Sequence, residues 1–461
     1  MKNKFVIHVL LIAALISMAA AALAAPKKVI LDSDMRPGFD DGAAMVLLAG
    51  YMNRNGNKID LLGVTVEAGN ETQPRGFAHG VRQLEIIGAK DLVHTDETKG
   101  IPIYMGTRYG LRADRLNKEV MEAEMRITGQ VIYPGYFGWV TNPDYAENPN
   151  RDPIQPWQDF YKGTDANDTN YGRYGAGEPT YPYAYYSTQR DGSSNADPDG
   201  IDNAVDFIVK TINDNPDNEV TILAIGPLTN VALALRKDPS IAGKVKEIVY
   251  MGGSFFMKGN SSAAAEFNWW ADPEAAKICV RTPWGDQKSE TFERYGNQVI
   301  DGLEAAAYIQ ALPASADIGP SKTDPRYSED EMTWFNQSRY FYDDLVEQCG
   351  FYRDLPNTGG AYDVIAAAWI IDPTVVTTWY SLRSENPVTN NTNMTGLKID
   401  VDSGYDVDYG RSIPYTIPHQ EGPSGTRKAA IMANTDPVKF WNEIVAPAFV
   451  DPKKTIPTPG F

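Results

Sequence analysis

The chain has 461 residues, and its 60 Asp and Glu side chains outnumber its 42 Lys and Arg side chains, which gives a formal net charge of −18. This charge argues against nucleic acid or anionic lipid as a partner, because both require clustered Lys and Arg, whereas neutral small substrates and cations are compatible with it. An acidic surface can equally serve solubility alone. Cys279 and Cys349 are too few for a disulfide scaffold and lack the spacing of a zinc site, so they are either separate buried thiols or one bridge.

Residues 1–24 have the pattern of an export signal. Two lysines precede an apolar run at residues 5–23, which ends in Ala-Leu-Ala, a sequence typical of signal cleavage sites. We expect a mature chain of residues 25–461 with a formal charge of −20, a periplasmic or extracellular location, and no membrane contact after cleavage. An uncleaved anchor is the alternative, since about 20 apolar residues suffice to span a bilayer.

Strands and helices alternate in the first part of the mature chain. Residues 28–34 (KVILDSD) are a short apolar run that ends in acids, which is typical of a buried strand, and residues 41–48 are rich in helix-forming side chains. Residues 59–66 (IDLLGVTV) predict a second strand and residues 81–87 a second helix. This alternation indicates βαβ units and parallel strands.

Two long segments have an irregular composition, and the first of them, at about 113–200, shows no helix or strand period. Ten of the 25 tyrosines lie between Tyr133 and Tyr186, within a stretch at about 113–200 that also carries many Gly, Pro, Asn and Asp residues. A stretch of this length is a lid over a functional site, a subunit contact, or a loop that packs on its own aromatic side chains. The segment at about 381–427 has a similar polar, Gly- and Pro-rich composition, and we expect it to be irregular as well.

After residue 200 the alternation returns. The pattern predicts helices at residues 204–212 and 230–236 and strands at residues 220–225 (VTILAI) and 246–251 (KEIVYM). We therefore expect one α/β domain with an open, mainly parallel sheet flanked by helices and with a large irregular insertion. In such sheets, ligands bind beyond the carboxyl ends of the strands.

Four carboxylates follow the first predicted strand within ten residues: Asp32, Asp34, Asp40 and Asp41. The apolar run before them indicates a buried approach and not an acidic surface turn. Unpaired carboxylates repel one another and are costly to bury, and a hard divalent cation resolves both problems. Calcium suits the group because it accepts about six to eight oxygens in flexible geometry, whereas magnesium requires an octahedron and keeps its waters. We therefore expect Ca²⁺ at this place.

A different class of enzyme also begins with an apolar strand that ends in Asp-x-Asp. In phosphotransferases that resemble haloacid dehalogenases, the first Asp of such a motif, here Asp32, is the nucleophile, and the activity requires magnesium. Those enzymes usually carry Thr or Val where this chain has Arg36. Asp40 and Asp41 have no role in that scheme, so this interpretation is the weaker one.

Six segments occur in the order typical of one family: ILDSDMRPGFDD, VTVEAGN, AIGPLTNVALAL, EIVYMGG, GNSSAAAEFNWWADPEAA and GGAYDVIAAAWIIDPTVV. They cover roughly half of the mature chain and resemble the inosine-uridine preferring nucleoside hydrolase family. The resemblance implies a Rossmann-like nucleoside hydrolase fold, a homodimer or homotetramer, and calcium-dependent hydrolysis of the N-glycosidic bond of ribonucleosides to free base and ribose. The expected partner is a nucleoside without phosphates, because an acidic protein repels nucleotides.

The resemblance also assigns roles to single residues. It implies that calcium is bound by Asp34, Asp41, the backbone carbonyl of Ile225 and Asp363, with Asp34 also taking a proton from the attacking water. It implies that the ribose hydroxyls are bound by Asp40, Asn70, Asn260, Glu266 and Asn268, and Asp32 is expected to anchor the loop. Taken alone, residues 259–268 would equally fit a polar loop with helix-capping side chains.

The chain departs from the family at the acid that protonates the leaving base. Many members carry His directly before the last calcium-binding Asp, and this chain has Tyr362. With a pKa of about 10, tyrosine donates a hydrogen bond but is a poorer acid than histidine at neutral pH. The alternative function is therefore a weak or inactive relative that binds a nucleoside or sugar with calcium. The spacing nominates none of His79, His94 and His419 as the acid, and the candidate for stacking on the base is an insertion residue such as Trp157.

Overall fold

The computed structural model describes residues 25–36, 40–70, 73–107, 110–111, 181–185, 197, 199–201, 203–305, 334, 338, 341–342, 345, 360–382, 394–404, 406–417 and 422–449. The predicted signal, most of the insertion and Cys349 lie outside this range. Cys279 is a buried free thiol. Among the described residues, no helix has the length and apolar character that a bilayer span requires.

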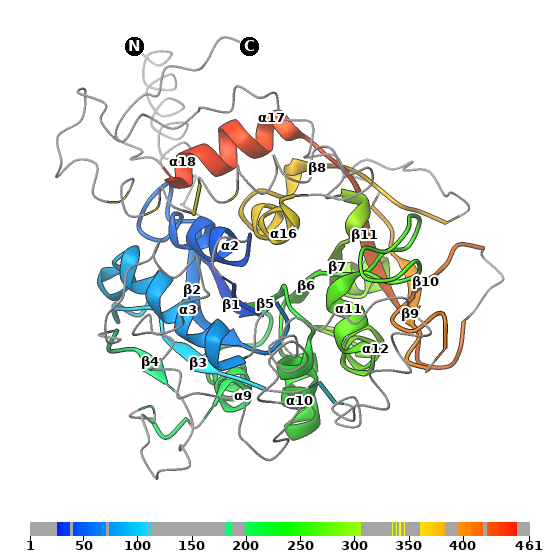
Figure 1. Ribbon diagram of the computed structural model, residues 1–461, viewed down its shortest axis with the longest axis horizontal. Coiled ribbons are helices and arrows are strands. Elements are labelled where there is room, and N and C mark those ends of the chain that lie inside the picture. Colours follow the sequence, from blue (N-terminus) through cyan, green and yellow to red (C-terminus); the bar gives the residue numbers. More distant parts are fainter. Residues whose placement is uncertain are drawn as a thin grey trace, which may run out of the picture.

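In the described part of the chain, eleven strands form one sheet (Figure 1). They are β1 Lys27–Ser33, β2 Ile59–Val66, β3 Ile103–Met105, β4 Ala184–Tyr185, β5 Val220–Ala224, β6 Glu247–Met251, β7 Gln298–Asp301, β8 Val376–Trp379, β9 Leu397–Val401, β10 Ser412–Tyr415 and β11 Arg427–Thr435. Their order is β10-β9-β11-β7-β6-β5-β1-β2-β3-β4, and β8 pairs with β11. The strands from β11 to β4 are parallel, and β8, β9 and β10 are antiparallel to their neighbours. The predicted open, mainly parallel sheet is confirmed.

Helices cover both faces of this sheet (Figure 1). One face is covered by α2 Asp40–Ala49, α3 Gln73–Ile86, α16 Tyr362–Ile371 and α18 Ala446–Phe449. The other face is covered by α9 Ala204–Asp214, α10 Thr229–Lys237 and α12 Pro273–Arg281. Shorter elements are α11 Phe267–Ala271, α13 Glu290–Tyr295, α17 Pro437–Lys439, the 3₁₀ turns Ala89–Asp91, Pro239–Gly243 and Pro373–Val375, and a π-helical turn at Phe440–Val445.

Alternate residues of the central strands enter two separate cores. Val29 and Leu31 of β1 belong to the core under α2, α3 and α16, whereas Ile30 belongs to the core under α9, α10 and α12. Side chains of a strand alternate between the two faces of a sheet, so a strand covered on both faces is apolar throughout. This explains the uninterrupted run of apolar residues in β1, and it leaves the ends of the strands as the places for polar groups.

The structure differs from the sequence prediction in the two segments expected to be irregular. β4 lies within residues 113–200 and pairs with β3, and β9 and β10 lie within residues 381–427 and pair with each other. β4 has two residues and β10 has four, which is too short for a period to show among the surrounding Gly and Pro residues. Helix α3 begins at Gln73, well before the predicted start at residue 81. The prediction missed its first turns because they contain Pro and Gly, which are poor helix formers.

Candidate active site

The predicted carboxylates meet at the carboxyl edge of the sheet. Asp34 directly follows β1, Asp40 and Asp41 begin α2, and Asp363 lies in the first turn of α16. Because α2 and α16 pack against each other (Figure 1), their amino ends bring these side chains together. All four carboxylates are at most 3% exposed. The positive ends of two helix dipoles favour negative charge at this place.

Three of these carboxylates fit one cation. Asp40, Asp41 and Asp363 each offer one oxygen, and the three oxygens lie within 4.8 Å of one another. Oxygens that share one ion at calcium–oxygen distances of about 2.3–2.6 Å are at most about 5 Å apart, so the spacing suits a single divalent ion. The group includes Asp40, which the family resemblance assigns to the ribose, and it brings Asp41 and Asp363 together from distant parts of the chain.

Asn70 ties Asp34 to Asp41. Its backbone N–H donates to Asp34 Oδ2 (2.6 Å), and its side-chain Nδ2 donates to Asp34 Oδ1 (3.2 Å) and to Asp41 Oδ2 (3.1 Å). The other oxygen of Asp41 accepts a hydrogen bond from Ser33 Oγ (2.7 Å). Asn70 therefore holds the carboxylate that follows β1 against the carboxylate that begins α2.

Burial and mutual repulsion raise the pKa values in this cluster. Burial, followed by the charge of Asp41, raises the pKa of Asp34 well above its usual value, and burial also raises the pKa of Asp41. At Asp363, burial and then the charges of Asp40 and Asp41 raise the pKa in the same way. A bound divalent cation would be the largest charge in such a site, and its positive charge would stabilise the ionised form of the carboxylates. The electrostatics of the cluster thus suit a bound metal ion.

A second group of predicted residues comprises Glu266, Asn268 and Ile225, which follows β5. Asn268 donates from Nδ2 to the carbonyls of Ile225 (3.1 Å) and Met251 (3.2 Å). Because a carbonyl oxygen has two lone pairs, Ile225 retains one for another partner. Glu266 accepts the backbone N–H groups of Gly253, Asn268 and Trp269, and burial raises its pKa to about 7.

Asn260 and Tyr362 lie at the edges of the site. Asn260 is exposed, and its Oδ1 accepts the backbone N–H of Phe267 (2.9 Å). This hydrogen bond joins the two ends of the loop at residues 260–267. Tyr362 is 7% exposed and precedes Asp363 at the start of α16. The structure therefore brings the aspartates and Asn70 together, with Asn268 bonded to Ile225, and keeps Asn260 on the outer loop.

Sequence reasoning misses a buried network beneath the cluster. Asp32 accepts hydrogen bonds from Thr65 Oγ1 (2.5 Å) and Asn230 Nδ2 (2.8 Å). Glu67 accepts the backbone N–H groups of Leu228 (2.8 Å) and Asn230 (2.7 Å). The signal for Glu67 is present in the sequence, because an acid that follows a buried strand marks the edge of the sheet where ligands bind. Asp32 is fully buried and makes the contacts of an anchoring residue, which argues against its being a phosphotransferase nucleophile.

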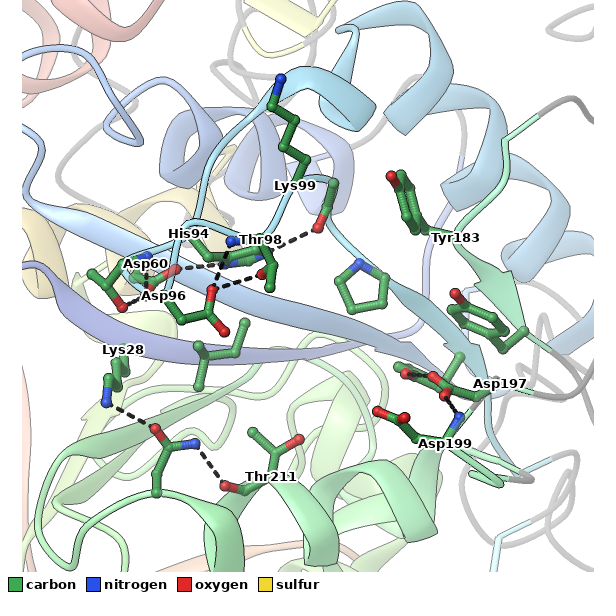
Figure 2. A pocket seen from close by; sticks show the side chains of 17 residues that line it. Lys28, Asp60, His94, Asp96, Thr98, Lys99, Tyr183, Asp197, Asp199 and Thr211 are labelled. Atoms are coloured by element: carbon green, nitrogen blue, oxygen red, sulfur yellow. Dashed lines mark hydrogen bonds and ion pairs between the residues drawn. The ribbon is translucent and has the colours of Figure 1, made fainter.

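His94 lies at the opposite edge of the sheet, in a separate pocket of about 400 Å³ (Figure 2). Its Nδ1 is 2.6 Å from Asp60 Oδ1, and its Nε2 is 2.8 Å from the carbonyl oxygen of Gly100. Asp60 lies near the start of β2, about 20 Å from the other end of that strand at about 3.3 Å per residue, so His94 is too distant to protonate a leaving base. His79 is buried on α3, and His419 and Trp157 lie outside the described residues.

Comparison with known proteins identifies the family. The family model of the inosine-uridine preferring nucleoside hydrolases matches residues 29–442. The inosine-uridine preferring nucleoside hydrolase of Leishmania major is 26% identical over 354 residues, which is 77% of this chain and 81% of that protein. The probable uridine nucleosidase 1 of Oryza sativa subsp. japonica is 58% identical over 77 residues, or 17% of this chain. The chain spans 24% of that rice protein, which is less than two thirds of its length.

Solved structures show the same fold. A plant nucleoside hydrolase, the PpNRh1 enzyme, matches 92% of this chain and 99% of its own, with a TM-score of 0.54 and 20% sequence identity. At this level of identity the match shows the fold alone, and it agrees with the predicted nucleoside hydrolase fold. Because the family model matches most of the chain, this protein belongs to the inosine-uridine preferring nucleoside hydrolase family.

Proposed function

We propose that this protein hydrolyses the N-glycosidic bond of ribonucleosides to free base and ribose, with calcium bound at the carboxylate cluster. The observation that carries the proposal is the convergence of buried Asp34, Asp40, Asp41 and Asp363 at the carboxyl edge of the sheet in a chain of this family. The Leishmania relative is named for inosine and uridine and the rice relative for uridine, so both purine and pyrimidine nucleosides are candidate substrates.

The donor set fits calcium because every proposed ligand is an oxygen. Following the family resemblance, we assign the ion to Asp34, Asp41, Asp363 and the backbone carbonyl of Ile225, and Asp40 to the ribose, although the structure groups the Asp40 carboxylate with those of Asp41 and Asp363. Flexible geometry with carboxylate and carbonyl oxygens is typical of calcium sites. Bound calcium would orient the ribose hydroxyls and lower the pKa of water in contact with it.

The side chains around the cluster can carry the remaining chemistry. Cleavage of an N-ribosidic bond passes through an oxocarbenium-like sugar, so nearby carboxylates stabilise the transition state. We propose that Asp34, which Asn70 orients, accepts a proton from the attacking water. Glu266 uses three of its roughly four acceptor positions on backbone amides and keeps one for a sugar hydroxyl. Asn268 directs Nδ2 to two carbonyls and keeps Oδ1 as an acceptor for a second hydroxyl.

Departure of the base is the step that this site supports least. Tyr362 stands where many family members have His, and its hydroxyl is a weak acid at neutral pH. This residue favours the alternative function, a calcium-dependent protein that binds a nucleoside or sugar with little turnover. We propose Tyr362 as the group that donates a hydrogen bond to the base.

We also propose that the protein is exported and acts as a homodimer or homotetramer, without nucleic acid or membrane partners. Export is supported by the sequence of residues 1–24 and by their small-residue ending. The subunit number is supported by the family resemblance alone. Amino-terminal sequencing of protein from the exported fraction should begin near Ala25, and light scattering of the mature protein should give two or four chains.

The activity is tested by incubating mature protein with inosine, adenosine, guanosine, uridine and cytidine and measuring reducing sugar. We expect ribose and free base in equal amounts from at least one nucleoside. No sugar at high protein concentration, with calorimetric binding of a nucleoside or ribose retained, would assign the protein to the binding class instead. Loss of both release and binding would contradict both functions.

A further inference from the structure

Glu67 stands between two parts of the site that lie far apart in the sequence. It directly follows β2, and its backbone N–H donates to the carbonyl of Ser33 (2.9 Å), beside the strand end that carries Asp34. Its side chain is fully buried and reaches the loop between β5 and α10. The position of Glu67 therefore links the end of β1 to that loop.

The carboxylate of Glu67 holds two backbone amides of this loop. Oε1 accepts the N–H of Leu228 (2.8 Å) and Oε2 accepts the N–H of Asn230 (2.7 Å). Two hydrogen bonds from one carboxyl group to two amides fix the orientation of the loop as well as its position. Both oxygens bond to the loop, so Glu67 acts on the site through the residues of that loop.

Leu228 shows that the loop is held in an unfavourable conformation. Its φ of 72° lies in the left-handed region, and its side chain is fully buried, so leucine there is a true outlier among non-glycine residues. Such conformations persist only where the surrounding structure determines them, and they gather at functional sites. The hydrogen bond from Leu228 to Glu67 is a contact of this kind.

The same loop packs directly against Asp34. The N–H of Ile225 donates to the carbonyl of Asp32 (2.8 Å), which continues the pairing of β5 with β1. A Cβ atom on Gly226 would lie 3.1 Å from the backbone N of Asp34 and 3.1 Å from Glu67 Oε1. The backbone at Gly226 is thus packed closely against both Asp34 and Glu67. A displacement of the loop would move the carbonyl of Ile225 and loosen the support of Asp34 together.

We propose that Glu67 is a positioning residue that sets the loop at residues 225–230 for calcium before the ion binds. The inference rests on the proposed calcium site, in which Asp34 and the carbonyl of Ile225 are ligands. Loss of one Glu67 hydrogen bond leaves a loop amide without its acceptor and lets the loop depart from the strained conformation. Calcium affinity should then fall by more than general loss of stability explains.

The test compares Glu67→Gln with Asp60→Asn in the mature protein. Asp60 is a matched control, because it is a buried carboxylate near the other end of β2 that accepts the backbone N–H of Thr95 (3.2 Å), in the separate pocket (Figure 2). Each protein is treated with EDTA, dialysed and titrated with calcium in a calorimeter, and its thermal unfolding is recorded in EDTA. We expect both variants to unfold at a lower temperature. The dissociation constant for calcium should rise at least tenfold in Glu67→Gln and less than twofold in Asp60→Asn.

Three results would go against the inference in different ways. A dissociation constant of Glu67→Gln within twofold of wild type overturns it and leaves the calcium proposal standing. Wild-type protein that binds no calcium overturns both. If Glu67→Gln does not fold, the inference is tested by measuring hydrogen exchange of the backbone amides of Leu228 and Asn230 in the wild-type protein. Protection in EDTA supports prior positioning by Glu67, whereas protection only with calcium shows that the ion orders the loop and overturns the inference.

Discussion

The backbone N–H of Asp363 donates a hydrogen bond of 3.0 Å to the carboxylate of Asp40, across 323 positions of the sequence. The bond joins the first turn of α16 to the first residue of α2. Both helices direct their amino ends to this place, where negative charge is favoured. The fold therefore gathers several buried carboxylates before any cation binds.

Substitution of Asp41 is expected to impair calcium binding most. Its carboxylate accepts hydrogen bonds from Ser33 and Asn70 and also lies close to the carboxylates of Asp40 and Asp363. Asp41→Ala should lose calcium and lower kcat/KM by about 10³-fold or more, since each 1.4 kcal/mol of lost stabilisation is tenfold in rate. Circular dichroism should show a folded protein. Asp199→Ala, an exposed acid in the separate pocket (Figure 2), should keep wild-type values. One calcium per chain retained by Asp41→Ala would contradict the ligand assignment.

Tyr362→His should raise the rate for substrates whose base needs a proton to leave. Histidine titrates near neutral pH, and a positioned general acid contributes roughly 10² to 10⁴-fold. We expect kcat to rise about tenfold or more for inosine and to change little for p-nitrophenyl riboside, whose leaving group departs without protonation. Tyr362→Phe is the control and should be slower than wild type on inosine alone. Equal effects of Tyr362→His on both substrates would show that the residue does not act on the leaving base.

His94 and Asp60 predict a pH-dependent contribution to stability. Both ring nitrogens of His94 face acceptors, an arrangement that favours the charged ring. Burial lowers its pKa, but the hydrogen bond and charge of Asp60 outweigh this effect and raise the pKa above its usual value. The stabilisation is complete below the unfolded-state pKa of about 6.5 and is lost as the pH rises through the higher folded-state pKa.

The effect can be measured with His94→Gln. This change should lower the free energy of unfolding by about 1.5–3 kcal/mol at pH 6, as expected for a buried hydrogen bond to a charged group, and by less at pH 9. Urea denaturation at both pH values checks this. An equal loss at the two pH values, or a larger loss at pH 9, would show that the ring is neutral in the folded protein.

The metal-free protein should lose stability as the pH rises. Burial raises the pKa of Glu266 to about 7 and the pKa of Asp34 and Asp363 well above their usual values. Acids with raised folded-state pKa values stabilise the fold below their unfolded-state pKa of about 4 to 4.5, and this contribution is lost as the pH rises toward the folded-state pKa. The urea concentration at the midpoint of unfolding in EDTA should therefore decrease as the pH is raised from 5 to 8. Saturating calcium should remove most of the fall, and midpoints in EDTA that rise over this range would contradict the prediction.

The central strands and the first carboxylates are readable from the sequence because of burial on both faces of the sheet. β1, β2, β5 and β6 consist mostly of apolar residues, and the acids of the cluster begin where the apolar run of β1 stops. β4 and β10 are short and lie among Gly and Pro, so no period marks them, whereas β9 (LKIDV) alternates between apolar and polar residues and the prediction misses its period.

The assembly of the site is not readable from local patterns. No sequence period indicates that Asp363 meets Asp40, and only the family resemblance places it with the other acids. The role of Glu67 depends on the left-handed conformation of Leu228, which leucine rarely adopts and which a sequence therefore does not suggest. Contacts of this kind are set by the packing of α2 against α16 and of β5 against β1.

The most direct measurement is ribose release by mature protein stripped with EDTA, before and during titration with calcium. The account predicts no release in EDTA, recovery that saturates at one calcium per chain, and no recovery for Asp41→Ala. Undiminished release in EDTA, or a calcium-saturated protein that releases no ribose from any nucleoside, would contradict it.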